Sequence, residues 1–325
     1  ESYKSASNPW RGKAGRLTVK QACSSDPLFD AFLEAGTQSG QGRSDDLNGA
    51  NPEGLARLDC TIVDGKRCSS ATAHLRPALR RANLTLITMA ESRKIVINRG
   101  KAQGVVFTHL GETITAFASL EVLLCAGAIN SPALLMKSGI GPAAHLKECN
   151  IPLRFHLPGV GQNLQDHAKI RLQFACKKRL PFHNIGKASS KMKNGLNWLL
   201  THRGMAASNI WETGGLIRSR SGLSHANLQY HFGPLGFTVL DGKIKVEQAF
   251  SLNVDQMRPK STGFVRLDRV NIHRPLIIAF RYMQDAHDLT EMIDAVKKAR
   301  ELVAQAAFDE FRGAEMKPGD QFQTD

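Results

Sequence analysis

An isolated carboxylate is the first feature of the sequence with an evident chemical use. Glu212 is the only carboxylate in the otherwise neutral stretch 205–217. Burying such a charge is costly unless it is paired, and a quaternary ammonium group would be a suitable partner. Trp211 could add a cation–π attraction, although strand alternation would point its ring to the opposite face. We predict that Glu212 binds a cationic ligand, with a surface or salt-bridged glutamate as the alternative.

Two histidines lie beside groups that suggest chemistry. His231 is flanked by Tyr230 and Phe232 in a strand-like run, where a histidine is often a hydrogen-bonded core residue. Asp166 and His167 look like a catalytic pair, but no chemical role for them can be defended. We therefore predict a structural role for that pair. For His231, a substrate-binding role and a structural role in the core both stay open.

A third feature is a strand-to-helix connection built from small residues. The run 121–142 is predicted to be a buried strand that continues through the small residues 126–128 into a helix. Ser131 is expected to cap this helix, Pro132 to be its first residue and Gly139 to make the left-handed turn at its end. A ligand can approach the backbone of the small turn, and the nearby helix dipole favours a phosphate-bearing cofactor. A tight connection without any ligand is the alternative.

The elements that must position these residues alternate between strand and helix, which indicates a mixed α/β or α+β protein. Asp26 and Pro27 predict the start of a helix whose apolar residues Leu28, Phe29, Phe32 and Leu33 precede its end at Gly36. Five β-rich runs follow, at 84–88, 95–98, 105–108, 113–117 and 122–124, with turns at 99–100 and 111. A compact sheet is therefore expected between residues 84 and 124.

A long amphipathic helix is expected near the end of the chain. Asp288 and Glu291 have the spacing of a capping box. Apolar residues then recur at helical spacing, at Leu289, Met292, Ile293, Val296, Ala299 and Val303.

Composition limits the class of protein. The 325 residues are 42% hydrophobic and 22% charged, as in soluble globular proteins of one large domain or two interleaved ones. The longest apolar run, 122–136, is interrupted by Asn130, Ser131 and Pro132, so no transmembrane helix is expected. The formal charge of +14 comes from short basic groups without a nucleic-acid motif, which makes nucleic acid an improbable partner. Six cysteines without a CxxC pair indicate neither zinc nor a disulfide framework, and favour a reducing compartment.

The order of residues in the small-turn segment resembles a known family signature. A small turn, Asn-Ser-Pro at 130–132, an apolar helix and Ser-Gly-Ile-Gly-Pro at 138–142 resemble the second signature of the glucose-methanol-choline (GMC) family of flavoprotein oxidoreductases. The segment 157–167 resembles the one that follows it in that family. Further agreement comes from the segments 46–49, 83–86, 257–261 and 311–313. The resemblance covers nearly the whole chain.

The resemblance implies a fold as well as a cofactor. The expected fold class is α/β plus α+β, with a GMC-type FAD-binding domain interleaved with a substrate domain built on an antiparallel sheet. By this map the substrate domain takes residues 1–65 and 162–315, the FAD-binding domain takes 66–161, and 316–325 returns towards that domain. The implied cofactor contacts are Ser92 on the adenine side, and Cys125, Ala126 and Gly127 at the small turn.

Two expected parts of such an enzyme are not found in this sequence. The family's GxGxxG fingerprint should precede Glu1, and Gly159-Val160-Gly161 lacks the third glycine and does not replace it. The family's catalytic histidine should lie beyond Asp325. We therefore expect a fragment of a longer enzyme, inactive by itself and without a catalytic residue of its own.

The segments 212–219 and 227–232 are most similar to the choline-oxidising members of the family. In those relatives a glutamate matching Glu212 faces the trimethylammonium group, and a histidine matching His231 lines the substrate site. Some of them carry another histidine two residues before the glutamate, where this chain has Ile210. That departure keeps an uncharged alcohol open as the substrate.

The sequence is compatible with three functions. The first is oxidation of choline to betaine aldehyde by hydride transfer to FAD, with electrons passed to an acceptor that is expected to be membrane-associated. The location would then be peripheral, at a bacterial cytoplasmic or mitochondrial inner membrane. The second is oxidation of an uncharged alcohol, and the third is a non-catalytic flavin-binding or protein-binding remnant.

Overall fold

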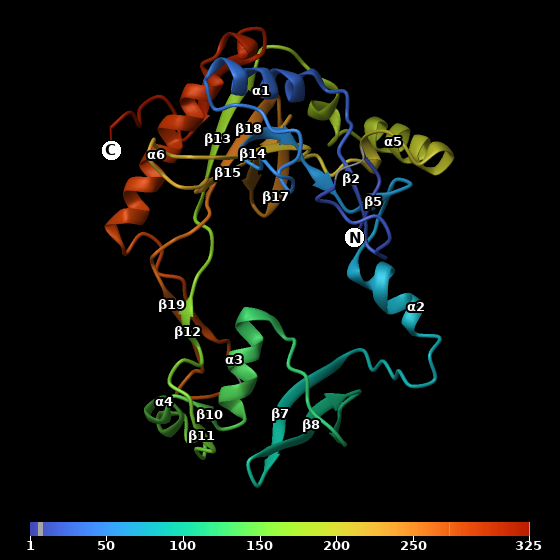
Figure 1. The fold of residues 1–325 in the computed structure, drawn as a ribbon, viewed down its shortest axis with the longest axis vertical. Helices are drawn as coiled ribbons and strands as arrows, with labels where there is room; N and C mark the ends of the chain where they lie inside the picture. Colours follow the sequence, from blue (N-terminus) through green and yellow to red (C-terminus); the bar gives the residue numbers. More distant parts are fainter. Residues whose placement is uncertain (6–8, 273, 325) are drawn as a thin grey trace. The chain divides into compact units, whose positions relative to one another are not determined.

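The computed structural model describes residues 1–5, 9–272 and 274–324, and the chain divides into two compact units (Figure 1). The larger unit contains Glu1–Leu84, His167–Arg258 and Leu289–Asp325. The smaller unit contains Thr85–Asp166 and Pro259–Asp288. Each unit is thus assembled from segments that are distant in the sequence, as expected for interleaved domains.

A six-stranded antiparallel sheet forms the centre of the larger unit. Its strands, in spatial order, are β21 (Arg312–Lys317), β13 (Lys169–Cys176), β18 (Ala249–Gln256), β15 (Leu228–Gly233), β14 (Thr213–Ile217) and β3 (Gly54–Arg57). Side chains alternate between the two faces of a sheet, so each strand contributes to both. One face is apolar and covered by helices, whereas the other carries polar side chains.

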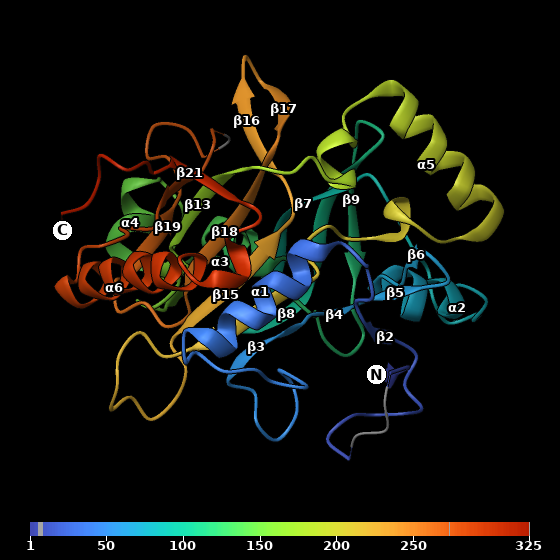
Figure 2. The same cartoon turned by 90° about the horizontal axis from the view of Figure 1, so that it is seen from above.

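Helix α1 (Pro27–Gln38) covers part of the apolar face (Figure 2). As predicted, Pro27 is its first residue and the Asp26 carboxylate accepts a hydrogen bond from the Leu28 N–H. Phe29 and Phe32 are fully buried, and Phe32 stacks on Phe232 of β15 with ring centroids 4.7 Å apart. The helix ends two residues later than expected, so Gly36 lies inside it.

Helix α6 (Ala286–Val303) and the short 3-10 helix η4 (Ala306–Phe308) extend this cover. Phe308 stacks on Phe250 of β18, with ring centroids 5.2 Å apart. The predicted capping box was wrong, because Asp285 accepts the His287 N–H at the helix start. Asp288 instead accepts the backbone N–H groups of Lys260 and Ser261.

The remaining elements of the larger unit lie outside the six-stranded sheet and its helical cover. They are the strands β1 (Ser2–Tyr3), β2 (Thr18–Gln21), β4 (Asp59–Cys60), β5 (Ile62–Val63), β6 (Lys66–Arg67), β16 (Gly236–Leu240) and β17 (Lys243–Glu247), and the helices η1 (Ala71–Leu75), α2 (Arg76–Ala78), η2 (Pro181–Asn184), α5 (Ala188–Thr201) and η3 (Met205–Ala207). The hairpin β16–β17 projects away from the edge of the sheet (Figure 2).

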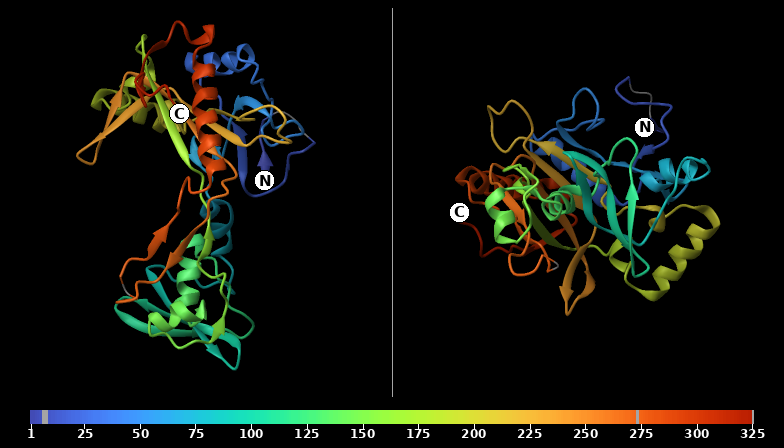
Figure 3. Two further views of the ribbon diagram at one scale, coloured as in Figure 1. Left: turned by 90° about the vertical axis from the view of Figure 1, so that its left-hand side faces the viewer. Right: turned by 90° about the horizontal axis from the view of Figure 1, so that it is seen from below.

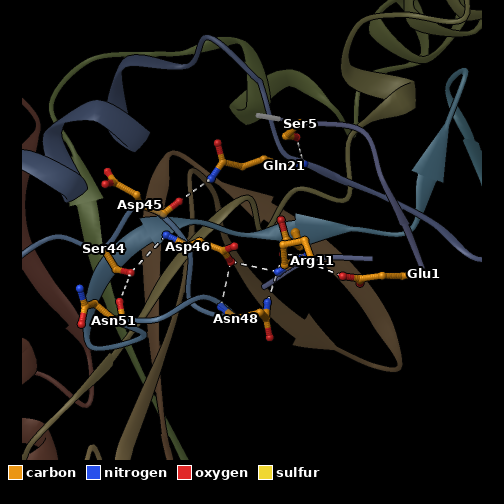
Figure 4. Close-up of polar contacts among 10 residues, drawn as sticks. Glu1, Ser5, Arg11, Gln21, Ser44, Asp45, Asp46, Asn48 and Asn51 are labelled. Carbon is orange, nitrogen blue, oxygen red and sulfur yellow. Dashed lines mark hydrogen bonds and ion pairs between the residues drawn. The ribbon is translucent and has the colours of Figure 1, made fainter. Parts of the chain in front are cut away.

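A buried ion cluster fixes the first segment of the chain to this unit (Figure 4). The Arg11 side chain is 3% exposed and forms ion pairs with Glu1, Asp46 and Asp59 at 2.6–2.9 Å. Asp46 also accepts the Asn48 N–H within the Asp-Leu-Asn-Gly turn. This turn, one of the family-like segments, is therefore a structural anchor.

The described residues of the smaller unit form three sheets and two helices. The strands are β7 (Ala90–Asn98), β8 (Lys101–His109) and β9 (Glu112–Phe117), then β10 (Ile140–Gly141) with β11 (Phe155–His156), and β12 (Gln162–Leu164) with β19 (Gly263–Arg266) and β20 (Ile277–Ala279). The helices are α3 (Gly127–Lys137) and α4 (Ala143–Glu148). Figure 3 shows α3, in green, running beside the β7–β8–β9 sheet.

Three of the five predicted strand runs are present, and two are not. Residues 84–88 and 122–124 have irregular backbone, and their neighbour Leu120 is 94% exposed. A strand must pair its N–H and C=O groups with neighbours, and the described residues supply no such neighbour for these two runs. Their apolar composition indicated that the side chains prefer burial. It did not indicate that a neighbouring strand is present to pair with their backbone.

Helix α3 begins earlier than predicted. It starts at Gly127 after Ala126, so Ser131 and Pro132 lie within the helix, and neither begins it. Gly127 adopts φ +80°, a left-handed backbone that glycine adopts without strain. The predicted left-handed turn at the far end is confirmed, with φ +87° at Gly139.

The boundaries of the two units differ from the predicted map. Residues 66–84 belong to the larger unit and 259–288 to the smaller one. The assignment of the units as substrate domain and FAD-binding domain stays a prediction.

Candidate functional site

One side of the six-stranded sheet carries an ordered set of polar residues, hereafter the polar face. Alternate positions of three neighbouring strands supply it, in cross-strand register: Lys169, Arg171 and Gln173 of β13, Ser251, Asn253 and Asp255 of β18, and Gln229, His231 and Gly233 of β15. The intervening residues of β18, Phe250, Leu252 and Val254, are fully buried on the apolar face. One strand therefore serves the core and the candidate site together.

His231 is held on this face by a carboxylate. Its Nδ1 lies 2.8 Å from Oδ2 of Asp255, a residue whose side chain is only 5% exposed. The Nζ of Lys169 lies 3.7 Å from the other oxygen of Asp255. The His231 side chain is 32% exposed, and among the described residues its Nε2 has no hydrogen-bond partner. This nitrogen is thus available to a ligand.

Other polar-face residues are engaged with one another and with the base of the β16–β17 hairpin. Arg171 donates to the Asn253 side chain and stacks over Phe237 at 4.0 Å, and burial lowers the pKa of its guanidinium. Gln173 accepts the Phe237 N–H, and Ser251 donates to the Leu235 carbonyl. The hairpin base therefore covers Gln173, Ser251 and Arg171, whereas His231 stays partly exposed.

Glu212 is a buried carboxylate held by neutral groups. It is 5% exposed, accepts the Ser24 N–H at 2.8 Å and accepts the Ser208 hydroxyl at 2.5 Å. Within the part of the chain that the structure describes, no cationic side chain forms an ion pair with it. Burial, with the nearby charge of Glu212, raises the pKa of Cys60 to about 11, so this thiol is neutral at pH 7.

The ring of Trp211 lies on the same face as His231. A Cβ on Gly233 would be 2.7 Å from this ring, and Gly233 and His231 alternate to the same side of β15. The expectation that strand alternation would point Trp211 to the opposite face was wrong. The strand begins only at Thr213, and Ile210 has φ +73°, which turns the chain before alternation applies.

The register of β14 relates Glu212 to His231. Gly214 pairs with His231, and the Leu58 N–H bonds to the Glu212 carbonyl, which continues the ladder by one residue. By alternation, Glu212 and Gly214 belong to the His231 side of the sheet. The contacts of the two groups are separate: Glu212 bonds to Ser24 and Ser208, and His231 bonds to Asp255.

The predicted cofactor residues all lie in the smaller unit. Cys125, Ala126 and Gly127 are exposed at the start of α3, and no atom lies within 4 Å of where a Cβ on Gly127 would be. Ser92 is exposed on β7. This strand is tied to the other end of α3 by a bond from the Ile95 N–H to the Ser138 hydroxyl. The structure therefore leaves the turn open and does not bring Ser92 into contact with it.

A cavity of about 460 Å³ joins the two family-like segments of the smaller unit. It is lined by Ala128, Ser131, Pro132 and Leu135 of α3, by residues 159–165 and by Val265 of β19. The backbone N–H groups at the start of α3 have no helical partner, and the helix dipole favours an anion there. An open backbone, a helix N-terminus and an adjoining cavity fit part of a phosphate-bearing cofactor.

Of the Asp166–His167 pair, only Asp166 has a side-chain hydrogen bond among the described residues. Asp166 accepts the hydroxyl of Tyr282, and burial together with this bond raises the pKa of that phenol to about 12. All six cysteines are unpaired. Among the described residues there is no cluster suited to a metal ion, and no helix is both long and apolar enough to cross a membrane.

Sequence reasoning missed several polar-face residues, above all Asp255 and Arg171. A signal was present, because Ser251-Leu252-Asn253-Val254-Asp255 alternates between polar and apolar residues, as a strand with one polar face does. The pairing of Asp255 with a histidine 24 residues away required the register of two strands, which composition does not give.

Comparison with known proteins identifies the family. The sequence models of GMC oxidoreductases match this chain at residues 2–169 for the N-terminal part and 259–325 for the C-terminal part. The chain belongs to the GMC oxidoreductase family.

Curated relatives are similar over the whole chain. The oxygen-dependent choline dehydrogenase of Brucella ovis is 41% identical over 327 residues, which cover 100% of this chain and 59% of the relative. The oxygen-dependent choline dehydrogenase of Burkholderia pseudomallei is 40% identical over 98% of this chain and 57% of its own length. This chain thus spans less than two thirds of the length of these relatives.

Solved structures share the fold. Pyridoxine 4-oxidase from Mesorbium loti has a TM-score of 0.79 and 26% identity, over 95% of this chain and 57% of that one. Formate oxidase has a TM-score of 0.87 and 20% identity, over 97% and 61%. The expected fold class, with mixed α/β and antiparallel-sheet architecture of the GMC type, is confirmed.

Proposed function

We propose that this chain is part of an FAD-dependent enzyme that oxidises choline to betaine aldehyde. The observation that carries the choice of substrate is the buried Glu212, whose partners are a hydroxyl and a backbone N–H. Its negative charge is balanced by no cation among the described residues. A quaternary ammonium group would supply that balance without needing a hydrogen bond.

The neighbours of Glu212 support a trimethylammonium group in particular. Such a cation has an apolar surface and is attracted to aromatic faces. Trp211 lies on the His231 side of the sheet, where Glu212 also belongs by strand register. An aromatic ring next to a carboxylate would attract this cation through both its charge and its methyl groups.

His231 would bind the other end of the substrate. Its Nδ1 is bonded to Asp255 and its Nε2 is available, so the ring can accept a hydrogen bond from the alcohol hydroxyl and orient the α-carbon. When bound, FAD supplies the acceptor for the hydride that leaves this carbon. The open turn at 125–127 and the cavity beside α3 would hold part of that cofactor.

A second candidate, oxidation of an uncharged alcohol, has one observation in its favour. Ile210 stands where some choline-oxidising relatives have a histidine, and it adopts φ +73°, which is rare for a β-branched residue. The isoleucine side chain also cannot make the hydrogen bond that a histidine at this position could make. An uncharged substrate would leave Glu212 as a structural residue.

The electron acceptor is proposed from chemistry and from the relatives. The two similar dehydrogenases are named oxygen-dependent, which supports oxygen as acceptor for this protein too. A membrane-associated acceptor and a peripheral location at a membrane remain the alternative proposal. Oxygen uptake in step with choline oxidation by the purified protein would support the first, and turnover only with added membranes the second.

The proposal is tested with the full-length protein that contains this chain. Under anaerobic conditions, choline should bleach the flavin absorbance, and 3,3-dimethylbutanol, its uncharged isostere, should do so far more slowly. The His231→Ala variant should retain its flavin and be reduced about 10- to 100-fold more slowly, the range expected for a hydrogen bond lost at the substrate. Bleaching by the uncharged alcohol alone would support the second candidate, and no bleaching by either would contradict an alcohol oxidoreductase.

A further inference from the structure

We propose that Asp255 is a positioning residue that fixes His231 in a single tautomer, with the proton on Nδ1 and the lone pair on Nε2. This inference rests on the proposed role of His231 as a substrate-binding residue. Its geometric basis is the 2.8 Å contact between His231 Nδ1 and Asp255 Oδ2. The two residues lie on the adjacent strands β15 and β18 and point to the same face.

The chemistry of the pair determines the tautomer. An ionised carboxylate can only accept hydrogen bonds, so the ring nitrogen that contacts it must carry the hydrogen. In a neutral imidazole the second nitrogen then carries the lone pair. The outward Nε2 of His231 would therefore accept a hydrogen bond from an alcohol and could not donate one.

The surroundings favour a fixed carboxylate. Asp255 is 5% exposed on a strand whose eight residues are all buried, and Lys169 approaches its second oxygen at 3.7 Å. Asn253, opposite His231 in the register, is already engaged by Arg171. The Asp255 side chain is thus held in place from both sides.

Another histidine of the same unit, the buried His183, is arranged in the opposite way. His183 Nδ1 accepts the Leu180 N–H at 3.0 Å, and its Nε2 lies 3.1 Å from the carbonyl oxygen of Ala249. A carbonyl accepts only, so His183 must carry its hydrogen on Nε2. The two histidines are therefore predicted to be opposite tautomers, and His183 is an internal reference for His231.

Nitrogen NMR tests the inference directly. The full-length protein, labelled with 15N in histidine and observed at about pH 8.5, where an ordinary histidine is neutral, should show a protonated Nδ1 for His231 and a protonated Nε2 for His183. Signals are assigned with His231→Gln and His183→Gln. A protonated Nε2 on His231 in the unmodified protein would overturn the proposal, whether or not any variant folds.

Variants of Asp255 test the cause. Asp255→Ala and Asp255→Asn remove the obligate acceptor, so the Nε2–H form of His231 should appear in at least one of them while His183 stays unchanged. Lys169→Met is the matched control, because it removes the neighbouring charge and leaves the carboxylate, and it should keep the Nδ1–H form. Retention of a fully Nδ1–H ring in both Asp255 variants would overturn the proposal.

Kinetics of the full-length enzyme separate this proposal from the proposed function. Asp255→Asn should lower kcat/KM for choline about 10-fold or more, and the double variant with His231→Ala should lose no more than His231→Ala alone, because coupled residues are not additive. Additive losses would make Asp255 an independent structural residue. If His231→Ala left kinetics unchanged while the tautomers were as predicted, the substrate role would fail and the tautomer assignment would stand.

Discussion

The two faces of the six-stranded sheet use the same strands for different purposes. On one face Phe232, Phe250 and Phe308 pack together with ring centroids 5.2–5.9 Å apart. On the other, His231, Asp255 and Lys169 form a polar group. The difference shows how an apolar layer can hold polar side chains in fixed positions, since His231 and Asp255 each have a buried neighbour on either side along the strand.

We expect the free energy of unfolding to depend mainly on packing at the apolar face. Phe232→Ala should have the largest effect, lowering the free energy of unfolding by about 3–5 kcal/mol, the usual cost of a cavity left by a buried phenylalanine. Its ring contacts four other aromatic rings. Urea denaturation followed by circular dichroism measures the change.

His231→Ala, one residue along the same strand, is the matched control. Its side chain is partly exposed, but its removal leaves the buried Asp255 carboxylate without this partner, so we expect a loss of about 1–3 kcal/mol, smaller than that of Phe232→Ala. Equal losses for the two variants would contradict the division between a stabilising face and a chemical face.

A smaller effect is expected where the two functions meet at Gly233. A methyl group there would lie 2.7 Å from the Trp211 ring, so Gly233→Ala should displace the ring and destabilise the fold by about 1–3 kcal/mol, as overpacking does. It should also raise the KM for choline. Trp211→Leu in the same chain should recover much of the stability without recovering KM, and failure of that rescue would place the strain elsewhere.

The smallest predicted effect concerns pH. Burial lowers the pKa of His183, whose Nδ1 accepts a backbone N–H. The unfolded state therefore binds this proton more readily, so stability is complete above the ordinary pKa of about 6.5 and falls as pH drops below it. Each unit of lowering corresponds to about 1.4 kcal/mol. Denaturation midpoints between pH 8 and 5 should fall less in His183→Gln than in the unmodified protein, and identical profiles would remove His183 as a cause.

Local chemistry in the sequence predicted much of the fold. The helix beginning at Pro27 followed from its cap and apolar spacing, and the hairpins of the β7–β8–β9 sheet followed from their turn residues. The runs 84–88 and 122–124 could not be predicted correctly, because a strand depends on a partner that composition does not reveal. The helix starts at Gly127 and Ala286 were missed because nearby Ser131 and Asp288 looked like better caps.

The candidate site was predicted only in part. Glu212 was predicted because it is a lone carboxylate in a neutral stretch, and His231 was predicted from the family resemblance. Asp255 was not found, because its partner is fixed by the register of β15 and β18. The side on which Trp211 lies depends on the positive φ of Ile210. No residue type in that segment predicts such a backbone conformation.

Glu212→Gln in the full-length enzyme shows whether Glu212 selects a cationic substrate. The amide keeps the size of the side chain and removes its charge. Its oxygen can still accept the Ser24 N–H, and the Ser208 hydroxyl would have to turn and accept from the amide NH2. We expect kcat/KM for choline to fall about 100-fold, or roughly 2.7 kcal/mol, while that for 3,3-dimethylbutanol changes less than about threefold. Equal losses for the two alcohols, with flavin content preserved, would show that Glu212 supports the fold and would contradict the account.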